Sequence, residues 1–203
     1  MLSYPIWLAV GYLVGSFPSG YIIGRLWAKK DIRSLGSGNI GATNVYRNLG
    51  LTPGATVLFL DIAKGWLPIW LAKEKTSFSP VELIGLGLAT VVGHTFSFWL
   101  KGRGGKGVAT SFGVMLGLFL QPAIVCFLIW LAVLSLVRYV SLASVAGAVA
   151  LPFLIYFFEQ DWILTACGVL VTGLIIWRHR ANIQRLASRQ ENRFFFPWER
   201  RSE

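Results

Sequence analysis

Two stretches of the sequence combine glycine with basic or hydrogen-bonding residues in a way that suits phosphate binding. The first runs from Ser34 to Arg47 and is dense in serine, glycine and asparagine. The second, Lys101 to Gly107, packs glycines around Lys106 and leads directly into an apolar segment. Glycine lets successive backbone N–H groups turn toward an anion, and a helix N-terminus adds partial positive charge. A positively charged turn at a membrane surface remains the alternative interpretation of the second stretch.

Neither stretch matches a nucleotide-binding loop. Gly36, Gly38 and Gly41 fit the GxGxxG spacing, but a membrane segment precedes them where the dinucleotide motif requires a strand. In the second stretch Gly107 follows the lysine, where a Walker A loop has the Ser or Thr that binds magnesium. We therefore expect no nucleotide, no cofactor and no metal.

A third candidate lies near the C-terminus, between Trp177 and Arg185. His179 and Asn182 are three residues apart there, which places them on one face of a helix just after an apolar segment. A histidine at such a position often only caps a helix or reaches the interface, so its role depends on the neighbouring loops. Ser141 and Ser144 share the same spacing, but serines in membrane helices usually bond their own backbone.

Ionisable residues inside the apolar segments are the remaining candidates. Asp61 and Lys64 are three apart and can neutralise each other on one helical face. Structural pairing is the interpretation we prefer for them, and His94 is ambiguous. Cys126 and Cys167 lie in apolar stretches without CxxC spacing, so we expect both to be packing residues.

The elements that carry these residues are membrane segments. Of the 203 residues, 55% are hydrophobic and only 14% are charged, which is typical of an integral membrane protein. The net charge of +10 does not indicate nucleic acid, because the basic residues gather in short connections between apolar segments. The apolar segments are 4–27, 53–71, 81–100, 108–137, 140–158 and 162–177.

The distribution of basic residues predicts an N-terminus outside and a C-terminus in the cytoplasm. This orientation holds only if the long segment 108–137 is interrupted, and Gln121-Pro122 lies near its middle. We therefore expect an all-α, polytopic membrane bundle of about seven transmembrane helices. Residues 1–193 would form a single transmembrane domain, followed by a short basic and aromatic tail over residues 194–203.

The three motifs together resemble the acyl-phosphate:glycerol-3-phosphate acyltransferase (PlsY) family of bacterial membranes. The resemblance rests on stretches that follow one another in the order of the family and cover nearly the whole chain: Ser37 to Asn44 with Arg47, Gly104 to Ala109, and Arg178 to Leu186. It extends to Glu191, but Arg189 stands where relatives tend to have glycine.

The resemblance implies transfer of a fatty acyl group from acyl phosphate to the sn-1 hydroxyl of glycerol 3-phosphate. The products are lysophosphatidic acid and phosphate, in the first step of phospholipid synthesis. Ser37, Arg47, Lys106 and His179 match catalytic positions of the family. The matching substrate-binding positions are Asn39, Thr43, Asn44, Gly104, Gly105, Gly107, Ser144 and Asn182.

The resemblance also implies a monomer in the bacterial inner membrane, in contact with lipid, with its active site facing the cytoplasm. Acyl-CoA and acyl carrier protein are not expected as donors. Neither His94 nor His179 has an aspartate five positions later, so the HxxxxD pair of commoner glycerolipid acyltransferases is missing. A transporter of a phosphorylated solute and a non-enzymatic lipid-binding protein are the alternatives.

Overall fold

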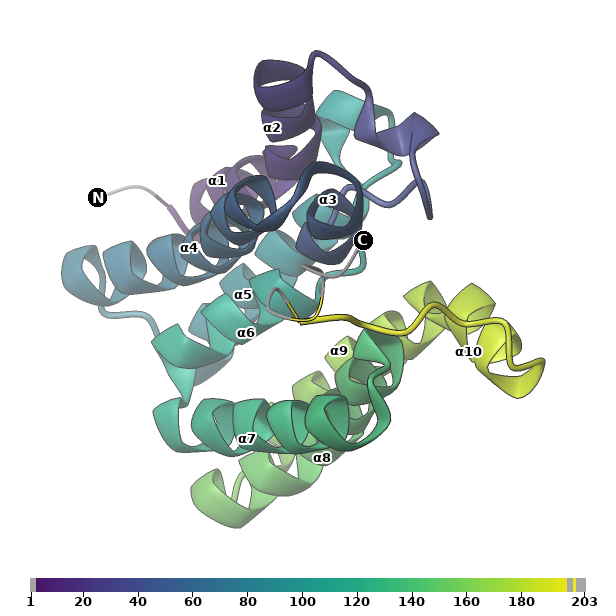
Figure 1. Ribbon diagram of the computed structural model, residues 1–203. Coiled ribbons are helices and arrows are strands. Elements are labelled where there is room, and N and C mark those ends of the chain that lie inside the picture. The colour runs from purple at the N-terminus through teal and green to yellow at the C-terminus, as the bar shows by residue number, and fades with distance from the viewer. Residues whose placement is uncertain (1–2, 197–198, 200–203) are drawn as a thin grey trace. The chain divides into compact units, whose positions relative to one another are not determined.

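The computed structural model describes residues 3–196 and 199, and over these residues the chain is entirely helical (Figure 1). This confirms the predicted fold class. The chain divides into two compact units, residues 1–120 and 121–203. The single domain expected over residues 1–193 stays a prediction.

The first unit contains six α-helices and two short 3-10 helices. Tyr4–Ser16 (α1) and Ser19–Ala28 (α2) together form the first apolar stretch, which breaks at Phe17 and Pro18. The remaining elements are η1 Ile32–Ser34, α3 Ala42–Leu49, α4 Leu51–Lys75, α5 Pro80–Thr95, η2 Phe98–Leu100 and α6 Val108–Leu118.

Small residues allow the long helices of this unit to approach each other closely. A Cβ at Gly15 of α1 would lie 2.0 Å from the carbonyl oxygen of Thr90 in α5. Likewise, a Cβ at Gly113 of α6 would lie 2.0 Å from the carbonyl oxygen of Ile62 in α4. Backbones in such contact are typical of membrane helix packing, because lipid supplies no hydrophobic driving force between helices.

A separate cluster of buried apolar side chains supports the loops at one end of the first unit. Five members, Ile32, Ile40, Val45, Val57 and Leu100, are at most 6% exposed. Two of them, Ile40 and Val45, come from the first glycine-containing stretch, Ile32 lies two residues before it, and Leu100 immediately precedes the second. The two stretches that the sequence singles out therefore share one hydrophobic core.

The second unit consists of Leu120–Val137 (α7), Val140–Glu159 (α8), Trp162–Arg178 (α9) and Arg180–Ala187 (α10). The hydroxyl of Thr172 in α9 donates to the carbonyl of Ala148 in α8 at 2.6 Å. A bend of 58° separates α9 from α10. Of the predicted tail, residues 194–196 and 199 are described, and Trp198 lies outside the described residues.

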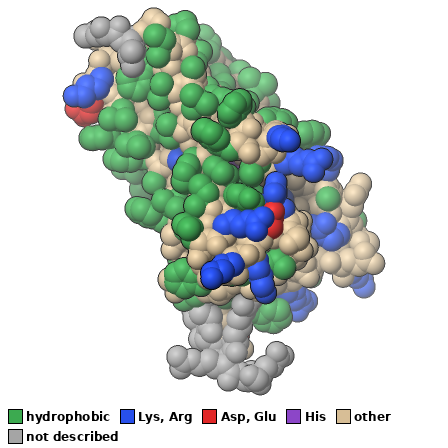
Figure 2. All heavy atoms as spheres, turned by 90° about the horizontal axis from the view of Figure 1, so that it is seen from above, with side chains coloured by type: hydrophobic (Ala, Val, Ile, Leu, Met, Phe, Trp, Pro, Cys, Tyr) green, Lys and Arg blue, Asp and Glu red, His purple; other side chains and the backbone are tan. Residues whose placement is uncertain are grey.

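Five helical stretches of the described chain are long and apolar enough to cross a membrane, or six if α9 and α10 count as one bent span. The eleven residues of α6 are apolar as well, but at roughly 16 Å they fall short of a hydrocarbon core of about 30 Å. The number seven and the orientation of the termini stay predictions. Hydrophobic side chains cover broad parts of the visible surface, whereas Lys and Arg stand in clusters (Figure 2).

The long apolar segment is interrupted as expected, but at a different residue. Helix α6 ends at Leu118, Phe119 has φ −140° and ψ 85°, and α7 starts at Leu120. Pro122 therefore lies in the first turn of α7, where helical N–H groups have no intrahelical partner and proline is tolerated. The expected turn at Gln121-Pro122 is wrong by two residues, because the proline starts the second helix and does not break the first.

Candidate active site

The segment from Ser34 to Gly41, here called the serine loop, folds around the side chain of Asn44. The Asn44 amide nitrogen lies within hydrogen-bond distance of three carbonyl oxygens, those of Ile32 (3.2 Å), Leu35 (3.0 Å) and Asn39 (2.8 Å). Its Oδ1 accepts the backbone N–H of Ser37 at 3.0 Å. Asn44 is 4% exposed. The side chain that we predicted to bind substrate therefore forms its hydrogen bonds within the protein and shapes the loop.

The other residues predicted for the site on this loop and on α3 remain more accessible. Ser37 is exposed, and Asn39, Thr43 and Arg47 are half-buried. The Asn39 side chain accepts the N–H of Gly41 at 2.7 Å, at the start of α3. Asn44 thus holds the backbone, whereas Ser37 and Arg47 can face a ligand.

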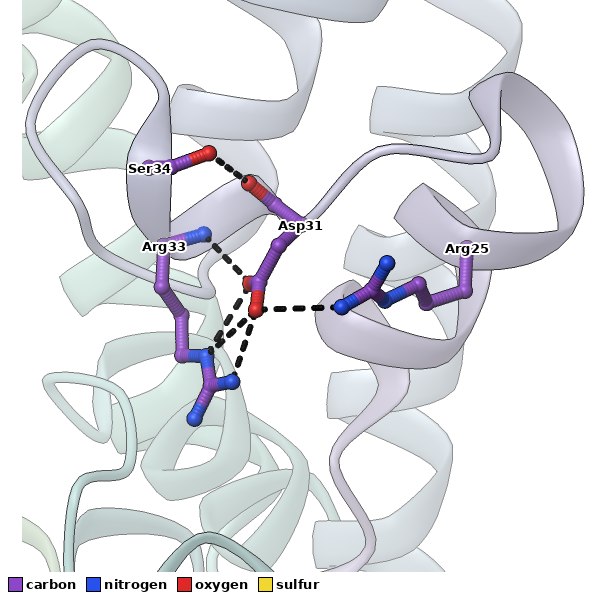
Figure 3. Close-up of polar contacts among 4 residues, drawn as sticks. All are labelled: Arg25, Asp31, Arg33 and Ser34. Carbon is purple, nitrogen blue, oxygen red and sulfur yellow. Dashed lines mark hydrogen bonds and ion pairs between the residues drawn. The ribbon is translucent and has the colours of Figure 1, made fainter.

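Asp31 fixes the entrance to the serine loop (Figure 3). Its carboxylate accepts from the Arg33 backbone N–H at 3.0 Å and from the Arg33 guanidinium at 2.7 Å, and Arg25 lies at 3.4 Å. These hydrogen bonds from Arg33, helped by the charge of Arg25, lower the pKa of Asp31 to about 2. Two arginines are therefore held beside the loop by a carboxylate that stays ionised.

The segment from Lys101 to Gly107, here called the glycine–lysine loop, folds back onto the C-terminal end of α5. The Gly104 and Gly105 N–H groups donate to the carbonyls of Thr95 and His94, at 3.2 and 3.0 Å. The N–H groups of Gly102 and Arg103 are also bonded to backbone carbonyls. Four amides of this loop, those of residues 102 to 105, are therefore bonded to backbone carbonyls, and the substrate-binding role expected of Gly104, Gly105 and Gly107 stays a prediction.

Close packing explains the glycines of this loop better than an anion cradle does. A Cβ at Gly104 would lie 1.9 Å from the His94 carbonyl oxygen, and one at Gly105 would lie 2.2 Å from His94 Nε2. Gly107 has φ +84° and directly precedes α6. The loop thus delivers half-buried Lys106 to the N-terminus of a helix, where a cation and the helix dipole can both act on an anion.

In the second unit, His179 lies at the junction between α9 and α10. Its Nδ1 is 2.8 Å from the carbonyl oxygen of Ile175, and the residue is 3% exposed. Because a carbonyl can only accept, Nδ1 carries the proton, and in the neutral ring Nε2 is left as an acceptor. The contact with Ile175 thus fixes the tautomer and the orientation of the ring.

Asn182 and its neighbours are organised by Glu191, a residue that we did not predict for the site. The carboxylate accepts from Asn182 Nδ2 (2.7 Å), Ser141 Oγ (2.9 Å) and Arg185 Nε (2.8 Å). Burial alone would raise the pKa of Glu191, but these hydrogen bonds and the Arg185 charge lower it below its ordinary value. The available sequence signal was that Glu191 is the only acidic residue between Arg178 and Arg193.

Ser144 follows the behaviour expected of a serine in a membrane helix. Its hydroxyl donates to the carbonyl of Val140 at 2.7 Å and accepts from Trp130 Nε1 at 3.3 Å. Its predicted contact with substrate stays a prediction. Among the described residues, no three His, Cys, Asp or Glu side chains gather in a way that could hold a metal ion.

Comparison with known proteins finds relatives that match nearly the whole chain. A family model described as Glycerol-3-phosphate acyltransferase matches residues 5–189. Proteins of that name from Desulforamulus reducens and Gloeobacter violaceus are 43% and 41% identical, over 86% and 97% of this chain and 87% and 97% of theirs. A crystal structure of PlsY, an integral membrane glycerol 3-phosphate acyltransferase in its glycerol 3-phosphate form, superposes with a TM-score of 0.90 at 38% identity and covers 96% of both chains. The lysophosphatidic acid form of PlsY gives a TM-score of 0.87 at 37% identity, over 98% of both chains. The protein described above therefore belongs to the glycerol-3-phosphate acyltransferase family.

Proposed function

We propose that this protein transfers a fatty acyl group from acyl phosphate to the sn-1 hydroxyl of glycerol 3-phosphate, releasing phosphate and lysophosphatidic acid. The observation that carries the proposal is the shared core beneath the serine loop and the glycine–lysine loop, to which Ile40 and Leu100 both belong. Arg47 of α3, which follows the serine loop, and Lys106 of the glycine–lysine loop are thereby held at one end of the first unit. Two phosphorylated substrates require such a pair of cationic positions.

The chemistry asks for orientation and charge stabilisation more than for a strong base. In acyl phosphate the acyl carbon is bonded to a phosphate oxygen, so phosphate leaves when the hydroxyl oxygen of glycerol 3-phosphate attacks that carbon. A new C–O ester bond forms as the old C–O bond breaks, and the hydroxyl proton passes to a phosphate oxygen or to His179. Positioning two bound reactants can by itself account for many orders of magnitude in rate.

Roles follow from charge and geometry. Lys106, a compact cation at the start of α6, stabilises the acyl phosphate and the negative charge that develops on it. Arg47 of α3 offers a planar fork that suits a phosphate bidentately, and Ser37 and Asn39 on the preceding serine loop are further hydrogen-bonding groups. His179 and Asn182 keep the catalytic and substrate-binding roles that the resemblance to the family implies. Thr43, Asn44, Ser144 and the loop glycines serve mainly to shape these positions.

The setting of the reaction belongs to the same proposal. A monomer in the bacterial inner membrane, with both loops in the cytoplasm, would meet soluble glycerol 3-phosphate and a lipid-borne acyl donor at one surface. Acyl-CoA and acyl carrier protein are not needed, because acyl phosphate already carries its own leaving group.

The first experiment measures phosphate release by the detergent-purified protein given palmitoyl phosphate, with and without glycerol 3-phosphate, and identifies the product by mass. We expect release that depends on glycerol 3-phosphate. Lys106→Ala should lower kcat by about 10²- to 10³-fold, as removal of one charge-stabilising donor does in other enzymes. Lys101→Ala, an exposed lysine of the same loop, is the matched control and should retain activity. Folded protein that forms no product, with palmitoyl-CoA also inert, would instead favour a transporter of a phosphorylated solute.

A further inference from the structure

The first unit holds a buried ionic cluster that the proposed chemistry does not use. Asp61 and Lys64 of α4 are 2% and 6% exposed, and the Lys64 ammonium lies 2.7 Å from Asp61 Oδ1. Ionisable groups inside membrane segments are costly and are retained where they do something. Besides each other, the two side chains contact the break between α1 and α2 and the C-terminal end of α5. Mutual neutralisation alone would not require these contacts.

One arm of the cluster reaches the break between α1 and α2. Lys64 Nζ donates to the carbonyl oxygen of Phe17 at 2.8 Å, and the hydroxyl of Ser19 donates to Asp61 Oδ1. The next residue, Gly20, packs so tightly on the serine loop that a Cβ there would lie 1.7 Å from the carbonyl oxygen of Ile40. The position of the α1–α2 break therefore fixes the backbone between Asn39 and Gly41.

The other arm reaches the glycine–lysine loop through α5. Asp61 Oδ1 lies 3.8 Å from Nδ1 of His94, which is 4% exposed. The His94 carbonyl accepts the Gly105 N–H at 3.0 Å, and the His94 ring lies directly against the Gly105 backbone. Gly105 directly precedes Lys106, so the position of the His94 ring influences the backbone position of Lys106.

We propose that the Asp61–Lys64 pair is the common anchor of the two substrate loops, with Asp61 and His94 as positioning residues for Lys106. The pair lies at the branch point, with the serine loop on one side and the lysine on the other. Asp61 Oδ1 accepts from Ser19 on one arm and faces His94 Nδ1 across 3.8 Å on the other, an electrostatic contact longer than a hydrogen bond, so loss of its charge loosens both arms together. This inference rests on the proposed function, since it assumes that the two loops hold substrate.

The test separates positioning from stability with four variants assayed for kcat, for KM of glycerol 3-phosphate and for melting temperature. They are Asp61→Asn, His94→Gln, the charge-free double variant Asp61→Asn with Lys64→Met, and Ile69→Val. Ile69 is fully buried in α4, away from both loops, and its substitution lowers stability without touching the anchor. It supplies the control for destabilisation alone.

We expect Asp61→Asn and His94→Gln each to lower kcat at least tenfold and to raise KM for glycerol 3-phosphate. Asp61→Asn should melt at a lower temperature, because Lys64 is left unpaired. The double variant should recover most of the melting temperature, since no buried charge is left alone, while kcat stays low. Ile69→Val should keep kcat and KM of the wild type.

Two results would overturn the anchor. One is wild-type kcat and KM in His94→Gln or Asp61→Asn; the other is recovery of kcat in the double variant in step with its melting temperature. If the wild type itself makes no lysophosphatidic acid, the proposed function fails. If the wild type is active and Lys106→Ala is not, while Asp61→Asn matches the wild type, only the anchor fails.

Discussion

Two buried side chains, Asn44 in the first unit and Glu191 in the second, solve the same structural problem with different chemistry. Asn44 is neutral and binds mostly backbone groups of the serine loop, so it fixes the course of the chain. Glu191 is charged and binds three side chains, those of Ser141, Asn182 and Arg185, so it fixes rotamers. A neutral centre gives a loop its shape, whereas an ionic centre aims functional groups and makes their position depend on pH.

The largest expected effect is the introduction of a charge at the neutral centre. Asn44→Asp replaces the amide donor with carboxylate oxygens facing three carbonyls, and we expect it to lower stability by about 4 kcal/mol and to abolish acyl transfer. Thermal unfolding in detergent measures the loss of stability, and phosphate release measures acyl transfer. Gln184→Glu, an amide-to-carboxylate exchange at an exposed position of α10, should cost less than about 1 kcal/mol. Equal effects at both positions would contradict the role of Asn44.

The next effect removes the charge from the ionic centre. Glu191→Gln keeps the shape but turns an N–H group toward one of the donors, so we expect a loss of about 2 kcal/mol and a rise in KM for glycerol 3-phosphate as Asn182 loosens. Glu159→Gln, the same exchange at an exposed position at the C-terminal end of α8, is the matched control. A Glu191→Gln variant with wild-type KM would show that Asn182 does not depend on this carboxylate.

Acid should separate the two centres without mutation. The folded-state pKa of Glu191 is lowered, so its contribution to stability is fully present above the unfolded pKa, near 4.5, and is lost as pH falls through the folded value. The melting temperature of the wild type should therefore approach that of Glu191→Gln below about pH 4. The difference between wild type and Asn44→Ala should stay constant over the same range, because Asn44 does not titrate. A constant Glu191 difference down to pH 3 would contradict the assignment.

The smallest effect concerns backbone conformation. The serine loop has glycine at its left-handed positions, Gly36 (φ +53°) and Gly38 (φ +69°). The segment after α10 instead has Arg189 at φ +58°. Arg189→Gly should raise stability by about 0.5–1 kcal/mol, because the left-handed region is strained for a residue with a Cβ. Gly36→Ala is the converse and should destabilise, since its Cβ would also meet Asn44 Oδ1 at 2.6 Å. An unchanged melting temperature for Arg189→Gly would show that the tail relaxes the strain locally.

The sequence predicts a feature when that feature depends on residues close together in the chain. It does not predict a feature that depends on contacts between distant segments. Hydropathy located the membrane helices, and glycine with lysine located the loops, because both signals are local. The direction of the loop amides could not be predicted, since it depends on the carbonyls of His94 and Thr95, which end a different helix. The role of Asn44 was hidden in the same way, because a buried amide that shapes a loop has the same sequence signature as one that binds a ligand.

The break between α1 and α2 has a consequence for how the chain enters the membrane. Until α4 has been synthesised, the Phe17 carbonyl lacks the Lys64 ammonium, and α4 arrives with two charges that need Phe17 and Ser19. Each segment is apolar enough to span a membrane, but its buried polar groups find these partners only when the two segments pack together. We therefore expect the first segment to wait beside the translocon until the second joins it, which makes the start of biogenesis a two-helix event.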